Sequence, residues 1–538
     1  NDADLFAYGE AAGGALPRIN QKLEAMGVAK RCHNLLGYTF GTGFGFGFVM
    51  DGKLNLGDNS CVETFCLKHR DTPQYIVEDG VSIRAIKRVY RELSGDNRAL
   101  EPYDIYRDGL KIYTTVDARM QRYAEQAVAE HMKEVVQPRM NSQIKARGSM
   151  YVDLSRQQIN DRIESAMRQS DRWRMMAKAG DSEEEIRASF DVPTKMEVFT
   201  FKGVRDTVLT PRDSILHHKR IMRASFVAMQ PQTGYVKAYV GGPSFQYFKY
   251  DMAKQGKRQI GSTVKPFIYT FAIDHLGMTP CTMVPNLPVT IETAVGAAWS
   301  PKEAGNVEYD GTLHPLKWGL TLSRNNYSAW VMKQAKQPET VADFLHNMGI
   351  NSYIYPAYAL CLGAFESNVF ELVSAYSTFV NEGVHIDPIF VTRIEDRQGN
   401  LISSFIPKSQ DAVNKQTAYT MLTMLERVIT AGTGGRLTWQ FGMKDMEIGG
   451  KTGTSNENRD AWFMCVTPTL VAGSWVGGED QSVHLSVSAE GSVMALPIVG
   501  EFLKRSYDDP HLGLSRNAKT PLATERQLEK GFPSHLLP

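Results

Sequence analysis

Three short motifs, far apart along the chain, place the strongest constraint on its fold. Ser262-Thr-Val-Lys265 contains a hydroxyl and an amine, Ser323-Arg-Asn325 a hydroxyl and an amide, and Lys451-Thr-Gly-Thr454 a cation and a glycine. Each motif alone is short enough to occur by chance. Together, and in this order, they supply the groups that acyl transfer through a serine requires. For them to act together, the fold must bring three distant segments to one cleft.

The first motif predicts a helix over residues 262–275 that begins at its own serine. Positions i and i+3 of a helix share a face, so Lys265 lies within reach of Ser262. The amine can act as a base only if burial and positive potential lower its pKa, and the amide dipoles at a helix start contribute to that potential. For this motif alone, the competing interpretation is an ordinary Gly-Ser helix cap beside a solvated lysine.

The second motif is typical of a turn or a loop between helices, since Ser and Asn are common turn residues. Its two side chains lie two positions apart, which allows both to face a cleft. We expect Ser323 to relay a proton between Lys265 and the leaving group, and Asn325 to bind a substrate amide.

The third motif predicts an edge strand that a ligand approaches. Gly453 has no side chain, which lets a substrate backbone come close. We expect Lys451 either to hold a substrate carboxylate or to lower the local potential, with Thr452 beside it in the strand. The backbone N–H groups of Thr454 and Ser262 would stabilise a tetrahedral oxyanion, a contribution of about 3–4 kcal/mol per donor. The alternative is a surface turn with an exposed lysine.

Length and charge bound the remaining possibilities. A chain of 538 residues with 42% apolar side chains can bury more than one core, so we expect about two or three domains. The formal net charge of +1 offers no general attraction for nucleic acid or an anionic membrane. Residues 1–10 lack a basic region and residues 32–50 indicate loop and strand, so we expect no signal peptide and no membrane segment. The six cysteines show no paired spacing and are interpreted as isolated thiols.

Changes in composition divide the chain into four parts. Residues 1–100 are glycine-rich, with a β-like run over 35–49. Residues 101–225 are strongly charged and are interpreted as a linker that precedes the main domain. Residues 226–507 form a large packed domain, and residues 508–538 a weakly ordered polar tail.

Hydrophobic periodicity predicts the elements of the last three parts. The charged part contains a strand over 110–115, a helix over 117–134 and, over 137–189, exposed helices without a core. The packed domain contains helices over much of 262–380 and several strands, for which the predicted ranges are 226–230, 235–240, 447–454, 461–466 and 471–476. A helix over 493–507 closes this domain.

The three motifs are the set found in penicillin-binding proteins and serine β-lactamases. Residues 226–505 resemble a penicillin-binding transpeptidase domain in further segments, which are Met229-Gln-Pro-Gln-Thr-Gly234, Tyr239-Val-Gly-Gly242, Arg258–Phe267, Gly432-Thr-Gly-Gly435, Trp462-Phe463 and Gly473-Ser-Trp-Val-Gly477. Leu110–Asp117 resembles the segment that joins the glycosyltransferase to the transpeptidase in bifunctional class A members, in the style of Bacteroidetes-type proteins.

This resemblance implies an α/β fold, a sheet flanked by helix clusters with the cleft between them. It implies that a D-Ala-D-Ala stem peptide of peptidoglycan acylates Ser262, and that the acyl group passes to an amine on a neighbouring strand. β-Lactam antibiotics would trap the same serine. No metal or organic cofactor is needed, a separate glycosyltransferase is a possible partner, and the implied location is the cell envelope or periplasm.

Two alternatives stay open within this reaction class. A class A β-lactamase deacylates through a water activated by a Glu-x-x-Leu-Asn type loop, and no such motif lies between Asn325 and Lys451. That favours a transpeptidase. The other alternative is a non-catalytic remnant, whose pocket binds β-lactam or peptide without turnover.

Residues 1–100 do not fit that family. Gly41-Thr-Gly-Phe-Gly-Phe-Gly47 follows a β-like run, and alternating glycines after a strand can close backbone N–H groups around phosphate. With Asn1-Asp2, Gly9-Glu10 and Gly57-Asp-Asn59, it resembles a fragment of a ROK-family sugar kinase, although a glycine-rich hairpin explains the loop equally simply.

In this resemblance Asp2 matches the catalytic base, and Gly41, Thr42 and Gly43 match the nucleotide phosphate loop. We find no first phosphate loop of Asp-x-Gly-x-Thr type, no completing nucleotide-site helices and no zinc motif, so we predict no kinase activity. The simplest hypothesis is a fused or mis-joined reading frame whose two fragments meet near residues 98–106.

Overall fold

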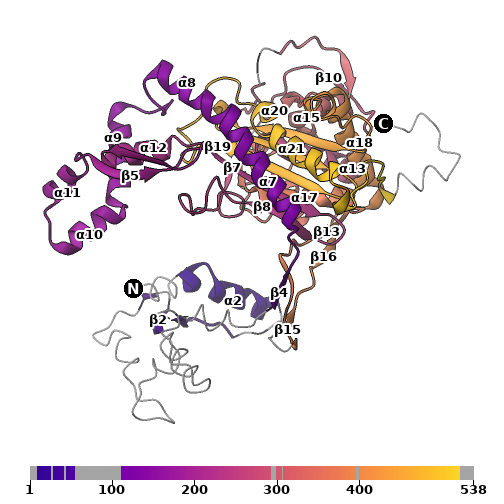
Figure 1. Ribbon diagram of the computed structural model, residues 1–538. Coiled ribbons are helices and arrows are strands. Elements are labelled where there is room, and N and C mark those ends of the chain that lie inside the picture. The colour runs from indigo at the N-terminus through magenta and orange to yellow at the C-terminus, as the bar shows by residue number, and fades with distance from the viewer. Residues whose placement is uncertain are drawn as a thin grey trace. The chain divides into compact units, whose positions relative to one another are not determined.

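Figure 1 shows the computed structural model of the chain. The structure describes residues 9–25, 28, 30–40, 44–51, 53–54, 111–292, 298–303, 305, 307–395 and 399–521. The chain divides into two compact units. One contains residues 1–113 and 393–404, and the other contains residues 114–392 and 405–538.

The first unit contains helix α2 (Ala15–Ala25) and a meander of β1 (Leu35–Phe40), β2 (Phe44–Met50) and β3 (Lys53–Leu54). β1 and β2 are antiparallel, with Leu35 opposite Val49 and Phe40 opposite Phe44. The β-like run predicted over 35–49 is therefore confirmed. The second half of the predicted phosphate loop, residues 44–47, is strand, which agrees with the glycine-rich hairpin alternative. Asp2, Gly41, Thr42 and Gly43 lie outside the described residues.

A small sheet follows along the chain, and then a long helical run. β4 (Lys111–Thr114) pairs in the order β15-β14-β4 with β14 (Val391–Glu395) and β15 (Leu401–Ser404), which confirms the strand expected over 110–115. Helix α7 (Ala118–His131) begins at Asp117, whose carboxylate accepts the backbone N–H groups of residues 119 and 120. It continues as the π-helix η1 (Met132–Val136) and α8 (Gln137–Arg147), so the helix predicted over 117–134 is confirmed.

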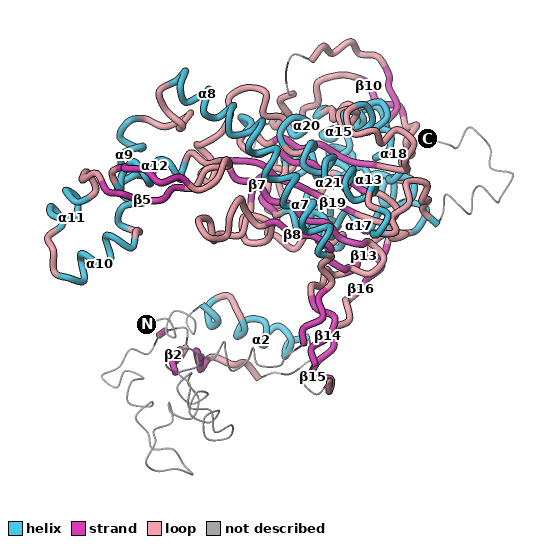
Figure 2. Tube along the Cα trace, in the orientation of Figure 1, coloured by secondary structure: helices cyan, strands magenta, loops and turns pink. Residues whose placement is uncertain are grey.

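The part that was predicted as exposed helices without a core has a core of its own. Helices α9 (Arg156–Arg168), α10 (Asp171–Ala179) and α11 (Glu183–Ser189) begin at capping serines and bring together five buried side chains: Ile163, Met167, Trp173, Ile186 and Phe190. The prediction was wrong because each helix buries only one or two large apolar residues among many charged ones. They form a core only where the three helices meet. Strands β5 (Thr194–Val198) and β6 (Arg205–Leu209) and helix α12 (Pro211–Lys219) complete this segment (Figure 2).

The main domain is built on a five-stranded antiparallel sheet in the order β17-β18-β19-β7-β8. Its strands are β7 (Arg223–Gln230), β8 (Tyr235–Val240), β17 (Gly449–Thr454), β18 (Asp460–Val466) and β19 (Val471–Gly477). The predicted hairpin and the three later strands are confirmed. The hairpin turns at Gly234, whose φ of +69° suits glycine.

Helices cover both faces of this sheet, because alternate residues of each strand point to opposite sides. Trp462 and Met464 of β18 belong to the core that helices on one face build, whereas Phe463 belongs to the core on the other face. The first face carries α13 (Lys265–Leu276), α14 (Leu316–Thr321), α15 (Asn325–Ala335), α16 (Pro338–Asn347), α17 (Val369–Val380) and α18 (Lys415–Ala431). The second face carries α7, α20 (Gly491–Met494) and α21 (Leu496–Asp508) (Figure 1). The helix predicted over 493–507 corresponds mainly to α21.

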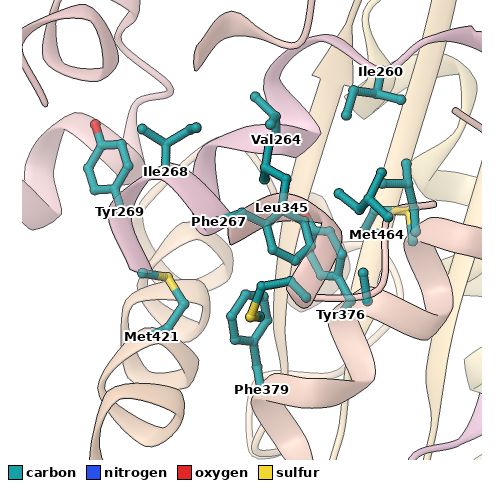
Figure 3. Close-up of a cluster of buried hydrophobic side chains, with 14 of the residues drawn as sticks. Ile260, Val264, Phe267, Ile268, Tyr269, Leu345, Tyr376, Phe379, Met421 and Met464 are labelled. Carbon is teal, nitrogen blue, oxygen red and sulfur yellow. The ribbon is translucent and has the colours of Figure 1, made fainter. Parts of the chain in front are cut away.

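The first of these cores supports the helix that bears the first motif. Figure 3 shows Val264, Phe267 and Ile268 packed among side chains of neighbouring elements, with Tyr376 and Phe379 of α17 below Phe267. The rings of Phe267 and Tyr376 meet edge to face at 5.1 Å. This packing fixes the helix axis relative to the sheet.

Shorter elements connect these layers. They are β9 (Arg258–Gln259), β10 (Met283–Pro285), β11 (Leu313–Pro315), β12 (Glu366–Ser367), β13 (Val384–Ile386), β16 (Ser409–Asp411), α19 (Arg436–Trp439) and the 3₁₀ helices η2 (Gly261–Val264), η3 (Tyr358–Leu362), η4 (Asn456–Asn458) and η5 (Pro510–Leu512). The beginning of the predicted tail is tied to the domain, since Asp509 accepts hydrogen bonds from Tyr123 and Arg119. Among the described residues, no helix combines the length and apolar character needed to cross a bilayer.

Candidate active site

The first motif lies where the 3₁₀ helix η2 passes into α13. The backbone N–H of Lys265 bonds to the Ser262 carbonyl, so the first turn is tighter than the α-helix predicted over 262–275. Pro266 follows and has no N–H, which suits a helix start, where that donor needs no partner. Ser262 thus lies in the opening turn, as expected, one turn before Lys265.

Lys265 is completely buried and is surrounded by acceptors of the second motif. Its Nζ donates to the Ser323 carbonyl at 2.6 Å and to Oδ1 of Asn325 at 2.6 Å, and it lies 3.4 Å from Oγ of Ser323. Burial lowers the pKa of Lys265 from 10.5 to about 8. The charge of Glu303 and the Cys361 thiol oppose this shift, whereas Arg324 adds to it. The pKa of this amine is therefore lowered, as a general base requires.

The second motif forms the connection between α14 and α15. Ser323 has a φ of +57°, a left-handed conformation that costs a non-glycine residue on the order of 1 kcal/mol or more. Asn325 is the first residue of α15. The expected turn between helices is confirmed, and its backbone strain accompanies the contacts that Ser323 makes with Lys265.

Lys451 of β17 also contacts the hydroxyl of Ser323. Its Nζ donates to Oγ of Ser323 at 2.8 Å and to the Thr452 carbonyl at 2.9 Å. Burial, and then the charge of Lys265, hold the pKa of Lys451 well below 10.5. The Thr452 hydroxyl hydrogen-bonds the hydroxyl of Thr433 at 2.8 Å, which brings the Gly432–Gly435 segment to the site.

Strand β17 packs directly on the turn that carries Ser262. A β-carbon at Gly453 would lie 2.6 Å from Cγ2 of Thr263, and one at Gly261 would lie 2.4 Å from the Thr454 carbonyl oxygen. Both distances are shorter than side-chain contacts allow, so the two glycines let the backbones meet. The sequence argument assigned Gly453 to substrate approach, whereas in the structure its missing side chain makes room for η2.

Residues outside the three motifs also hold the site, and they carry no local sequence signal. The carboxylate of Glu303 accepts the backbone N–H groups of Asn325 and Asn326, and the Lys302 carbonyl accepts from Nδ2 of Asn325. The hydroxyl of Tyr376 donates to the Thr263 carbonyl at 2.6 Å. Only the folded chain reveals these contacts, because the partners are distant in sequence.

Of the cysteines that the structure describes, Cys361 lies near enough to Lys265 to influence its pKa. Cys32, Cys281, Cys361 and Cys465 are free thiols, and the last two are buried. Within the described ranges, His, Cys, Asp and Glu side chains do not gather in a group of three that could hold a metal ion.

Comparison with known families agrees with this architecture. Residues 146–222 match the penicillin-binding protein middle domain, and residues 224–474 match the penicillin-binding protein transpeptidase domain. Penicillin-binding protein 1A of Neisseria flavescens is 27% identical over 440 residues, which cover 74% of this chain and 53% of the relative. Penicillin-binding protein 1A of Vibrio cholerae is 31% identical over 331 residues, which cover 53% of this chain and 40% of the relative. The chain thus spans about half the length of the curated relatives it matches.

Solved structures share the fold. Penicillin-binding protein 1A from Haemophilus influenzae superposes with a TM-score of 0.56 at 21% identity, covering 81% of this chain and 71% of its own. PonA1 from Mycobacterium tuberculosis in complex with penicillin V gives a TM-score of 0.51 at 21% identity. The match covers 81% of this chain and 94% of the PonA1 chain. The family matches therefore identify residues 224–474 as a penicillin-binding protein transpeptidase domain, with a match to the middle domain ahead of it over residues 146–222.

Proposed function

We propose that the chain is a peptidoglycan D,D-transpeptidase with Ser262 as its nucleophile. The observation that supports this most is the meeting of three distant motifs. Lys265 and Lys451 both hydrogen-bond Ser323, at 2.6 and 2.8 Å, and Ser262 lies one turn before Lys265. The matched family domain and the relatives named penicillin-binding protein 1A point to the same reaction.

Lys265 takes the proton of Ser262 in the first step. With a pKa of about 8, about a tenth of this amine is neutral at pH 7. A neutral amine has two N–H groups, which satisfy the two acceptors at 2.6 Å, and a lone pair that is free to accept the serine proton. The Ser262 oxygen then attacks the carbonyl between the two D-alanines, and the backbone N–H groups of Ser262 and Thr454 stabilise the oxyanion.

The tetrahedral intermediate collapses as the C–N bond to the terminal D-alanine breaks. Ser323, held between the two lysines, passes the proton to the departing amine. An amine of a neighbouring strand then attacks the acyl-enzyme and gives up a proton, which returns to Ser262. Asn325 binds a substrate amide, and Lys451 with Thr452 binds the terminal carboxylate.

The same assignment sets the partners and the location of the protein. The substrates are stem peptides that end in D-Ala-D-Ala, and the inhibitors are β-lactams that acylate Ser262. The reaction takes place in the cell envelope. A separate glycosyltransferase supplies the glycan strands, and hydrolysis of the acyl-enzyme would give a carboxypeptidase side reaction.

Fluorescent penicillin tests this proposal on the full chain. We expect covalent labelling that survives denaturation, and mass spectrometry should map the penicilloyl adduct to Ser262. Ser262→Ala should abolish the label while thermal melting stays unchanged. Equal labelling of this variant would contradict the proposal. Rapid turnover of the adduct would instead indicate a β-lactamase, and reversible binding without an adduct would indicate a non-catalytic remnant.

For the rest of the chain we propose the division expected from the sequence. Residues 1–100 are a ROK-like fragment without kinase activity, residues 101–225 precede the transpeptidase, residues 226–507 carry it, and residues 508–538 are a tail. An assay with ATP and hexose should show no phosphoryl transfer. Sequencing reads across residues 98–106 of a native transcript test the fusion, since continuous coverage would contradict a mis-joined frame.

A further inference from the structure

The loop segment 298–303 contacts the turn of the second motif through two consecutive residues. Oε2 of Glu303 accepts the N–H of Asn325 at 3.1 Å, and Oε1 accepts the N–H of Asn326 at 2.6 Å. The first N–H groups of a helix have no partner within the helix. A single carboxylate therefore caps the start of α15, and it comes from a residue more than twenty positions earlier in the chain.

The neighbouring residue fixes the side chain of Asn325. The Lys302 carbonyl accepts from Nδ2 of Asn325 at 2.6 Å, while Oδ1 of the same amide accepts from Lys265. The amide of Asn325 is thus held at both ends. One of its two N–H groups is engaged by the loop, and the other is available to a substrate.

The charges around this contact connect it to the catalytic amine. The charged or titratable groups that act on Lys265, or that it acts on, are Glu303 of the loop, Arg324 of the turn, Cys361 of η3 and Lys451 of β17. Glu303 is the largest of these influences that favour the charged form of Lys265. The loop therefore acts on the same amine by hydrogen bonding through Asn325 and by charge.

We propose that Glu303 is a positioning residue of the acyl-transfer site, which holds the Ser323-Arg-Asn325 turn against Lys265 without touching substrate. The proposal rests on the function proposed above and extends its machinery beyond the three motifs. Loss of the carboxylate removes the acceptor of the backbone N–H groups of Asn325 and Asn326, so the start of α15, which carries the amide that binds Lys265, is held less firmly. Misplacement of a catalytic group by about 1 Å can cost on the order of 100-fold in rate.

The test is the rate constant for acylation by fluorescent penicillin across pH, measured on the full chain. We expect Glu303→Ala to lower the plateau rate by about 10- to 100-fold. Glu303→Gln keeps an oxygen that can accept one N–H, so its rate falls less. The acidic limb of its pH–rate profile, where the acylation rate rises with pH, moves to lower pH. The reason is that the negative charge that raises the pKa of Lys265 is gone. Glu308→Gln, an exposed carboxylate in the same connection, is the matched control and should match wild type.

Glu303→Gln decides the outcome if Glu303→Ala fails to fold. A folded Glu303→Gln with the wild-type plateau and an unshifted acidic limb would overturn the proposal, and so would a lower plateau with no shift of that limb. Both results leave the function of the site intact, because wild-type labelling that depends on Ser262 is measured in the same series. Failure of the proposed function itself would appear as labelling that Ser262→Ala retains.

Discussion

Ser323 lies between two buried amines, and this arrangement shapes the chemistry at the scale of single residues. Its Oγ accepts from Lys451 at 2.8 Å and lies 3.4 Å from Lys265. Two ammonium groups this close in a buried site repel each other, so each favours the neutral form of its neighbour. Burial is the main cause of the lowered pKa of Lys265; Arg324 adds to it and Glu303 partly offsets it, and the charge of Lys265 in turn lowers the pKa of Lys451.

This pKa predicts how acylation depends on pH. The base is active only when deprotonated, and its pKa is lowered from 10.5 to about 8. The acylation rate should therefore rise about tenfold per pH unit below this value and level off above it. Stopped-flow labelling with fluorescent penicillin measures this limb. A rate that is independent of pH between about 6 and 9 would show that Lys265 is not the base.

At the scale of elements, the site depends on the contact between an edge strand and a helix start. β17 lies against η2 with backbone close to backbone, because glycines stand at residues 261 and 453. The hydroxyl of Tyr376 on α17, a residue of the core, donates a hydrogen bond to the Thr263 carbonyl. The turn that carries Ser262 is thus held between a strand and a helix, both of which belong to the domain core.

Gly453→Ala tests this contact. The added methyl group would meet Thr263 at 2.6 Å and the Ile260 carbonyl oxygen at 3.0 Å. We expect a loss of about 1–3 kcal/mol in the free energy of unfolding, as for other overpacked sites, with a disproportionate loss of acylation because η2 must shift. Chemical denaturation and penicillin labelling measure the two effects. Gly242→Ala is the control, since its methyl group would lie 3.8 Å from the nearest atom, and wild-type acylation by Gly453→Ala would refute the argument.

Some elements were predictable from sequence and others were not, for a physical reason. The hairpin around Gly234 and strands β18 and β19 have local signatures, namely turn residues between apolar runs, and β17 is marked by the Lys451-Thr-Gly-Thr454 motif. The core around Trp173 and the cap by Glu303 have none, because their partners meet only in the folded chain. The motif residues that the sequence singled out lie close together in the structure, whereas the sequence argument missed contacts made through backbone carbonyls and N–H groups.

At the scale of the whole molecule, the unit that carries the site contains separate hydrophobic cores. The two large cores lie on opposite faces of the sheet, and the small core of α9 to α11 lies within residues 146–222, the matched middle domain. Cores that share few side chains can lose stability independently. Damage to the small core should therefore leave the acyl-transfer site working.

Trp173→Ala tests this independence. The indole is buried against Phe190 and lies under the guanidinium of Arg168. Its removal should cost about 3–5 kcal/mol locally, which is large for so small a core. Hydrogen exchange should show faster exchange over residues 156–190, while penicillin labelling of Ser262 stays at the wild-type level. Loss of labelling together with this exchange would show that the cores are coupled.

The sequence by itself determined the candidate reactive groups of this protein and the order of its strands and helices near the motifs. Nucleophile, amine, amide and glycine are properties of residue type, and local periodicity follows from backbone geometry. Tertiary structure alone decided that Ser323 lies between Lys265 and Lys451, that Gly453 makes room for η2, and that Glu303 holds Asn325. These relations depend on distances between segments far apart in the chain, and packing of the cores sets those distances.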